Sequence, residues 1–99
     1  MKINVNSVKF KVDTKLDAFI RDKVEKLSSH NDSIISSDVI LKIDNANTVD
    51  NKIVEIKVAI RGNELFSKKQ SKTFEEALDN CTDALKKQLI KHKEKVKKV

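Results

Sequence analysis

The chain has 99 residues, enough for one domain around one hydrophobic core, and its 38% apolar and 36% charged residues predict a soluble protein. The absence of proline, the single glycine and the lack of any apolar run near the ~20 residues of a membrane span exclude Gly-rich phosphate loops and transmembrane helices. One cysteine excludes an internal disulfide, and we expect a cytoplasmic protein.

The net charge of +6 is concentrated at the C-terminal end. Residues 1–85 carry 14 basic and 14 acidic side chains, whereas residues 86–99 carry seven lysines and one acid, Glu94. This distribution is typical either of an electrostatic docking surface for a polyanion or of a solvated tail that maintains solubility. Charge alone does not decide between these two alternatives.

The N-terminus predicts a β-strand. Polar and apolar residues alternate over residues 1–7, as in a half-buried strand. Val8, Phe10 and Val12 keep the same alternation, so we expect the extended segment to continue through them.

A helix is expected to begin at Asp13 or Thr14 and to run to about Ser29, followed by a loop over residues 30–33. Thr14 and Asp17 have the spacing of an acidic capping box. Apolar residues recur at helical spacing and form one stripe: Leu16, Phe19, Ile20, Val24 and Leu27.

The middle of the chain predicts three strands. Residues 39–43 indicate the second strand, and the Asn- and Asp-rich stretch 44–52 indicates a connecting loop. Gly62-Asn63 is expected to make a tight hairpin turn from the third strand into a fourth strand over residues 64–71. In the second strand, one face is formed by Val39, Leu41 and Ile43. In the third strand, the face toward the core is formed by Val54, Ile56, Val58 and Ile60.

The last helix is expected to open at Thr73, which forms a capping box with Glu76, and to extend to Lys97. Over residues 74–97 it spans about 36 Å, whereas four strands cover only ~20 Å of sheet width, so we expect its last turns to overhang the core. Its apolar stripe consists of Phe74, Ala77, Leu78, Cys81, Leu85 and Leu89.

The predicted element order is β-α-β-β-β-α within a single domain over residues 1–99. This order indicates an α+β fold with a four-stranded mixed sheet and both helices on one face, an arrangement similar to that of double-stranded-RNA-binding domains. The last three strands can form an antiparallel meander, and the crossover helix makes the first strand parallel to its neighbour.

The lysines of the last helix fall into two stripes that flank a seam formed by Gln88, His92 and Val96. A favourable helix dipole contributes only a few tenths of a kcal/mol per lysine, about as much as repulsion between neighbours costs. A partner that neutralises the lysines therefore explains them better, and His92 is either an ordinary surface residue or a contact to RNA. One stripe contains Lys87, Lys91, Lys95 and Lys98, and the other contains Lys86, Lys93 and Lys97.

Lys23 interrupts the apolar stripe of the first helix, between Ile20 and Leu27. Its ammonium group either reaches water past an apolar stem or emerges between the two helices and meets a phosphate there, with Lys26 beside it. Both interpretations fit the sequence.

Five short motifs together are typical of one protein family: Lys2–Val5, Leu16…Lys23…Lys26-Leu27, Arg61–Leu65, Lys87-Gln88-Leu89 and Lys91–Lys95. Through them, nearly the whole chain resembles the ribosome hibernation family, which comprises hibernation-promoting factor and the ribosome-associated inhibitor and is also called the sigma-54 modulation family. The resemblance implies binding to ribosomal RNA in the decoding region of the small subunit, where messenger and transfer RNA would be displaced and translation inhibited under stress.

In that family, basic residues of both helices face RNA, and the matching positions here are Lys23, Lys26, Lys87, Lys91, Lys93 and Lys95. With Lys86 from one lysine stripe and His92 from the seam between the stripes, they form the predicted RNA-binding set. Ala84 stands where the family often has lysine, and we expect the extra dimerising domain of the family's long form to be absent. We therefore expect a monomer when the protein is off the ribosome.

Enzymatic function is not expected. Cys81 lies on an apolar stripe, and His30 and His92 have no zinc-binding spacing, so the sequence predicts no catalytic residue, metal, cofactor, small-molecule substrate or membrane partner. The competing interpretation is a protein-interaction module whose lysine-rich helix docks an acidic partner, such as a transcription (sigma) factor.

Overall fold

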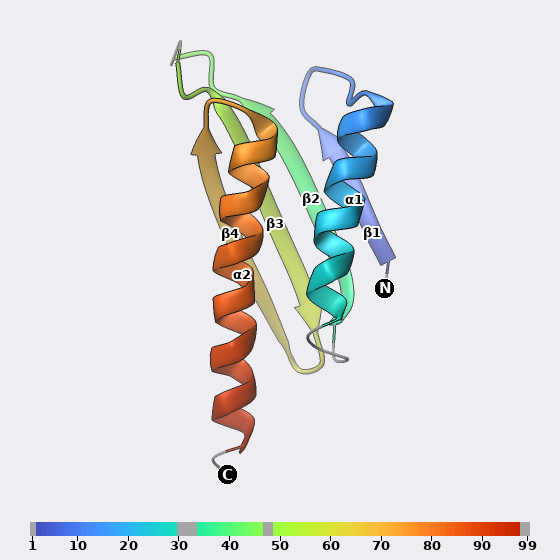
Figure 1. The fold of residues 1–99 in the computed structure, drawn as a ribbon, viewed down its shortest axis with the longest axis vertical. Helices are drawn as coiled ribbons and strands as arrows, with labels where there is room; N and C mark the ends of the chain where they lie inside the picture. Colours follow the sequence, from blue (N-terminus) through green and yellow to red (C-terminus); the bar gives the residue numbers. More distant parts are fainter. Residues whose placement is uncertain (1, 30–33, 47–48, 98–99) are drawn as a thin grey trace.

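The computed structural model describes residues 2–29, 34–46 and 49–97, and within the last stretch it describes side chains through His92. Both helices lie side by side on one face of the sheet (Figure 1). The predicted α+β fold is therefore confirmed, whereas the loop expected at residues 30–33 lies outside the described residues. The elements are β1 (Lys2–Ser7), α1 (Thr14–Ser28), β2 (Ile34–Ile43), β3 (Lys52–Ile60), β4 (Asn63–Ser71) and α2 (Phe74–Lys97).

The four strands lie in the order β1-β2-β3-β4. β1 is parallel to β2, with Val5 opposite Val39, and β3 is antiparallel to both of its neighbours, with Ile56 opposite Val39 and Ser67. The mixed sheet and the antiparallel meander are thus as predicted.

The hydrophobic core lies between the sheet and the two helices. Val54, Ile56 and Val58 of β3 are fully buried, as their alternation predicted, whereas Ile43 at the end of β2 is 40% exposed. The helices contribute their apolar stripes to the same core, and the fully or almost fully buried members are Ile20, Val24, Leu27, Ala77, Leu78, Cys81, Leu85 and Leu89.

The extended segment predicted beyond residue 7 is wrong. β1 ends at Ser7, and the chain bends through Lys9, whose φ of 66° is unusual for a residue with a side chain. The bend is held because the Ser7 hydroxyl donates to the Phe10 carbonyl, and the Phe10 ring stacks on Phe74 at 5.3 Å between centroids. The alternation of polar and apolar residues therefore extends beyond the strand, because Phe10 is apolar for its contact with Phe74 and not for a place in β1.

The N-cap of α1 is Asp13, not the alternative Thr14. An Asp13 carboxylate oxygen accepts a hydrogen bond of 2.7 Å from the Leu16 backbone N–H, so the acidic capping box predicted at Thr14 is absent. Asp13 already satisfies an unpaired donor of the first turn, and Thr14 is the first helical residue.

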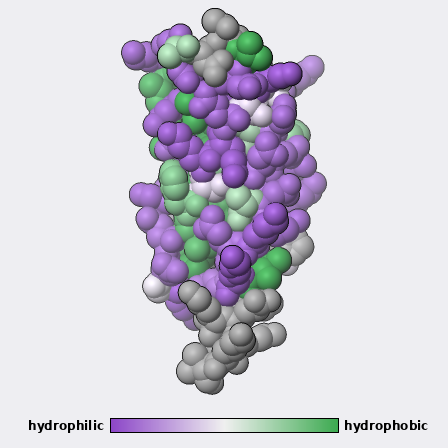
Figure 2. Space-filling model, turned by 90° about the vertical axis from the view of Figure 1, so that its left-hand side faces the viewer, coloured by the Kyte–Doolittle hydropathy of each residue, from purple (hydrophilic) through white to green (hydrophobic). Residues whose placement is uncertain are grey.

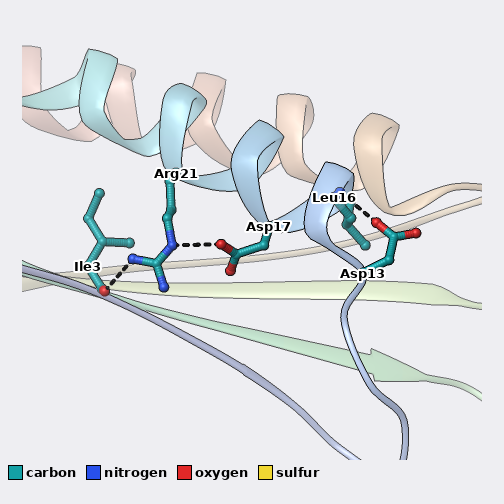
Figure 3. A network of polar contacts seen from close by, with 5 residues as sticks. All are labelled: Ile3, Asp13, Leu16, Asp17 and Arg21. Atoms are coloured by element: carbon teal, nitrogen blue, oxygen red, sulfur yellow. Dashed lines mark hydrogen bonds and ion pairs between the residues drawn. The ribbon is translucent and has the colours of Figure 1, made fainter.

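Asp17 has a different role, because it pairs with Arg21 at 2.9 Å one turn later (Figure 3). The Arg21 guanidinium also donates to the Ile3 carbonyl at 3.1 Å. These contacts join α1 to the outer edge of β1.

The β3–β4 hairpin turns at Arg61-Gly62, one residue earlier than predicted. Ile60 and Asn63 are opposite each other in the ladder, so Asn63 belongs to β4. Gly62 adopts a φ of 78°, which glycine reaches without a steric penalty, as the sequence indicated.

α2 begins at Phe74, directly after Thr73 as predicted, and the Thr73 hydroxyl accepts a 3.1 Å hydrogen bond from the Glu76 N–H, one of the two hydrogen bonds of the predicted capping box. Its C-terminal end projects past the sheet, but the width argument behind that prediction is wrong, because α2 runs along the strands and not across them (Figure 1). The helix has 24 residues and spans about 36 Å, whereas the nine residues of β4 span about 30 Å. Leu89 is buried, whereas Ile90, about 100° further around the helix, is 53% exposed.

Candidate nucleic-acid interface

The two halves of α2 carry opposite charge. Residues 74–85 contain four acids and no lysine or arginine, whereas residues 86–97 contain six lysines and one acid. Acids near the N-terminus and lysines near the C-terminus both follow the direction of the helix dipole. The surplus cations of the chain are therefore concentrated in the C-terminal half of α2.

A groove of about 300 Å³ separates α1 from α2. It brings together three residues of the predicted RNA-binding set, because Lys23 and Lys26 of α1 and Lys86 of α2 all line it. Two acids of α2, Asp79 and Asp83, line the same groove. The groove is therefore of mixed charge and not uniformly basic.

Lys23 emerges between the two helices and pairs there with an acid. Its ammonium nitrogen lies 3.0 Å from a carboxylate oxygen of Asp79 and 5.6 Å from the centre of the Phe19 ring. The side chain of Lys23 is 34% exposed and that of Asp79 is 50% exposed, so solvent screens much of their attraction. Contact between Lys23 and a phosphate stays a prediction, and it would have to compete with Asp79.

The other two cations of the groove differ in their surroundings. Lys26 pairs with Asp22 at 3.3 Å on the same helix, and both side chains are largely exposed. Lys86 is exposed and forms no ion pair with another residue whose side chain is described.

Lys87 and Lys91 do not line the groove. Successive residues of an α-helix are about 100° apart, so these lysines project from a different side of α2 than Lys86. Both are exposed, and within the part of the chain with described side chains neither forms an ion pair. The predicted set is therefore divided between a groove and an outer surface of α2.

Between these sides, Gln88 donates a 2.9 Å hydrogen bond to the Phe66 carbonyl of β4 and fixes the rotation of this part of α2. His92 is half-buried. Lys93 and Lys95 belong to the helical backbone, but their side chains lie outside the described residues, as does Lys98 of the first stripe.

Sequence reasoning missed the acidic side of the groove. Asp79 lies in the first turns of α2, where acids suit the helix dipole, so neither it nor Asp83 was predicted to belong to the site. Their four-residue spacing, with Lys86 three residues further on, places all three on one side of α2. That spacing was visible in the sequence, but the partner on α1 was not.

The Cys81 thiol is not an exposed nucleophile. Cys81 is fully buried, and its Sγ lies 3.2 Å from the Ser67 carbonyl, to which it donates. Burial raises the pKa of this thiol above its usual value of 9.0 and so disfavours the reactive thiolate. Within residues 2–29, 34–46 and 49–97, no three His, Cys, Asp or Glu side chains are grouped to hold a metal ion.

The surface around α2 and β4 is mainly hydrophilic. Figure 2 views the molecule from the side on which these two elements lie, and the hydrophobic areas on it are small and separate. None of the described helices has the length and apolar character to cross a membrane. A partner on this side would therefore meet charges and polar groups.

Two curated proteins are similar to the chain over most of its length. A ribosome hibernation promoting factor of Pseudomonas putida is 30% identical over 95 residues, which cover 96% of this chain and 89% of the relative. A protein of the same name from Azotobacter vinelandii is 28% identical over 95 residues, 96% of this chain and 85% of the relative.

Two solved structures share the fold. A ribosomal subunit interface protein from Coxiella burnetii superposes with a TM-score of 0.84 at 22% identity and covers 94% of this chain and 98% of its own. The N-terminal domain of Thermus thermophilus Protein Y gives a TM-score of 0.76 at 18% identity, with 89% and 94% covered. The sequence model of the family described as sigma 54 modulation protein / S30EA ribosomal protein matches residues 3–97. The chain therefore belongs to the sigma 54 modulation protein / S30EA ribosomal protein family.

Proposed function

We propose that residues 1–99 form a ribosome-binding domain that contacts RNA of the small subunit in its decoding region and inhibits translation under stress. The proposed contact residues are Lys23, Lys26, Lys86, Lys87, Lys91, His92, Lys93 and Lys95. The protein acts as a cytoplasmic monomer without a cofactor and catalyses no reaction. Support comes from its family membership and from the names of its relatives, which are a hibernation promoting factor and a subunit interface protein.

The observation that carries the proposal is the exposed pair Lys87 and Lys91. They lie one helical turn apart on α2, and neither has an ion-pair partner among the residues with described side chains. Cations of this kind release condensed counterions when they meet phosphates, and this release drives nucleic-acid binding. α2 is anchored through Leu85 and Leu89, so the two lysines are displayed on a rigid support.

The expected mode of binding is contact with the phosphate backbone and little reading of bases. Lysine presents a point charge, and the chain has no Trp or Tyr on which a base could stack. Phe10 is already stacked on Phe74. Specificity then depends on the shape of the RNA surface.

The test is the double variant Lys87→Glu/Lys91→Glu, assayed by co-sedimentation with small ribosomal subunits. We expect ribosome binding to be abolished, because two attractive contacts become repulsive, while circular dichroism shows an unchanged fold. The matched control is Lys11→Glu/Lys15→Glu, which makes the same change in net charge. Both control residues are exposed and lie near the start of α1, at the opposite end of the molecule from the end of α2 (Figure 1).

Undiminished co-sedimentation of the α2 variant would refute the proposed interface. Equal loss in both double variants would show that net charge, and not this surface, determines binding.

The description of the family also names sigma 54 modulation, which favours docking to an acidic transcription factor as a second candidate function. Nuclease treatment distinguishes the two candidates. Association that depends on intact RNA supports the ribosomal proposal, and association that survives nuclease supports the protein partner.

A further inference from the structure

The α1–α2 groove contains an ion pair at one of the proposed contact residues. Lys23 lines the groove, and Asp79 holds its ammonium group at 3.0 Å. A phosphate that binds Lys23 must therefore break this ion pair. The bound phosphate would then lie near the unpaired carboxylate of Asp79, which repels it.

We propose that Asp79 is a specificity-determining residue that keeps Lys23 from binding loosely placed phosphates. The inference deepens the proposed function and rests on it for the identity of the RNA surface that is finally bound. Asp79 acts through Lys23 and need not touch RNA.

The physical basis is the small size of each competing effect. An exposed ion pair contributes roughly 0.2–1 kcal/mol, which corresponds to about a 1.4- to 5-fold change in affinity. A flexible or featureless polyanion that offers one phosphate to the groove gains little, because Asp79 offsets the attraction. A shaped RNA that engages Lys86 and the outer lysines of α2 at the same time places its phosphate firmly and overcomes the competition.

The ion pair also changes the expected response to salt. When a free lysine meets a phosphate, each contact contributes about 0.7–0.9 to the slope of log affinity against log salt concentration. Salt also weakens the exposed ion pair between Lys23 and Asp79, so the exchange of Asp79 for a phosphate becomes easier as salt rises and offsets part of the lost attraction to RNA. In the wild-type protein, Lys23 therefore adds less to the slope than a lysine without an ion pair.

Asp83 provides the matched control for Asp79. It lies one turn later on α2 and lines the same groove, but it forms no ion pair with Lys23. Asp79→Asn and Asp83→Asn remove the same charge from the same groove, so a difference between them reports the ion pair and not the net charge.

The experiment measures binding of the full chain to a duplex RNA of arbitrary sequence and to small ribosomal subunits, over a series of salt concentrations. For the duplex, we expect Asp79→Asn to raise affinity about 1.4- to 5-fold at low salt and to steepen the salt slope by less than the ~0.7–0.9 of a full phosphate contact. We expect Asp83→Asn to raise affinity less and to leave the slope unchanged. For the subunits, Asp79→Asn should change affinity less than for the duplex, so that discrimination falls.

Two further variants separate competition from a structural effect. Asp79→Glu retains a carboxylate that can reach Lys23, and we expect it to restore the wild-type salt slope. In a Lys23→Gln background, Asp79→Asn should behave like Asp83→Asn, because there is no longer a lysine to release.

Equal salt slopes for Asp79→Asn and Asp83→Asn would overturn the inference, as would weaker duplex binding by Asp79→Asn. The duplex measurements do not involve the ribosome. A wild-type protein that fails to bind subunits would therefore contradict the proposed function, whereas the duplex series decides the role of Asp79 by itself.

Discussion

The two halves of α2 differ in burial and in charge, although they form one continuous helix. Residues 74–85 are acidic, and their apolar stripe lies in the core through Leu78, Cys81 and Leu85. Residues 86–97 are basic, and the last buried side chain described among them is Leu89. The first half anchors the helix, and the second half displays lysines beyond the sheet (Figure 1).

The difference between the two halves indicates that folding stability and RNA binding depend on different residues of the same helix. It also explains why the groove has mixed charge, because the acidic half of α2 faces the cations of α1. The following changes test the division, in order from the largest expected effect to the smallest.

Leu85→Ala should destabilise the protein by about 2–5 kcal/mol, because a fully buried leucine in a packed core leaves a cavity. Ile90→Ala removes a side chain that is 53% exposed, and we expect it to alter the free energy of unfolding by less than about 0.5 kcal/mol. Denaturant unfolding of both variants measures the difference. Similar losses would mean that burial against the core does not set the contribution of an apolar side chain of α2.

Single neutralisation of the outer lysines should weaken RNA binding without affecting stability. Lys87→Gln and Lys91→Gln should each reduce the salt slope of subunit binding by about 0.7–0.9, the contribution of one phosphate contact. Lys23→Gln should reduce it less, since Asp79 already neutralises that lysine. Binding measured over a salt series checks the order, and a larger change for Lys23→Gln would reverse our assignment.

The anchored half should also give stability a dependence on alkaline pH. Burial raises the pKa of the Cys81 thiol above its usual value of 9.0. The unfolded chain therefore ionises first, so the stabilisation is complete below that value and is lost as pH rises toward the folded-state pKa. Cys81→Ala should show a shallower loss of stability above pH 9 than the wild type, whatever its stability at neutral pH. Parallel curves would contradict the assignment.

The smallest expected effect is that of Lys23→Gln on folding. Loss of its partly exposed ion pair with Asp79 should cost about 0.2–1 kcal/mol of unfolding free energy, near the lower limit because solvent screens the pair. Lys87→Gln, which removes no ion pair described in the structure, should cost less. Thermal unfolding at low and high salt distinguishes them, because only the Lys23 effect should shrink with salt.

Most helices and strands could be predicted from the periodicity of apolar residues, because this periodicity is contained within each short segment of the sequence. The strict alternation from Val54 to Ile60 allows only a strand, and the helical spacing of Leu78, Cys81 and Leu85 fixes the buried face of α2. The end of β1 could not be predicted, because the bend at Lys9 depends on the contact between Phe10 and Phe74, which are far apart in the chain.

The candidate site was predictable in composition but not in arrangement. Runs of lysine are visible in the sequence, whereas the pairing of Lys23 with Asp79 joins residues 56 positions apart. The direction of α2 along the strands likewise depends on packing. Lys86 therefore shares a groove with Lys23, whereas Lys87 projects elsewhere.

The side chains that Arg21 and Gln88 extend toward the sheet have one more consequence. Arg21 donates to the Ile3 carbonyl on one outermost strand (Figure 3), and Gln88 donates to the Phe66 carbonyl on the other. An unpaired strand edge invites a second polypeptide to add to the sheet. Each helix thus occupies one backbone acceptor that such an addition would need, so strand addition at either margin would have to displace a side chain of a helix.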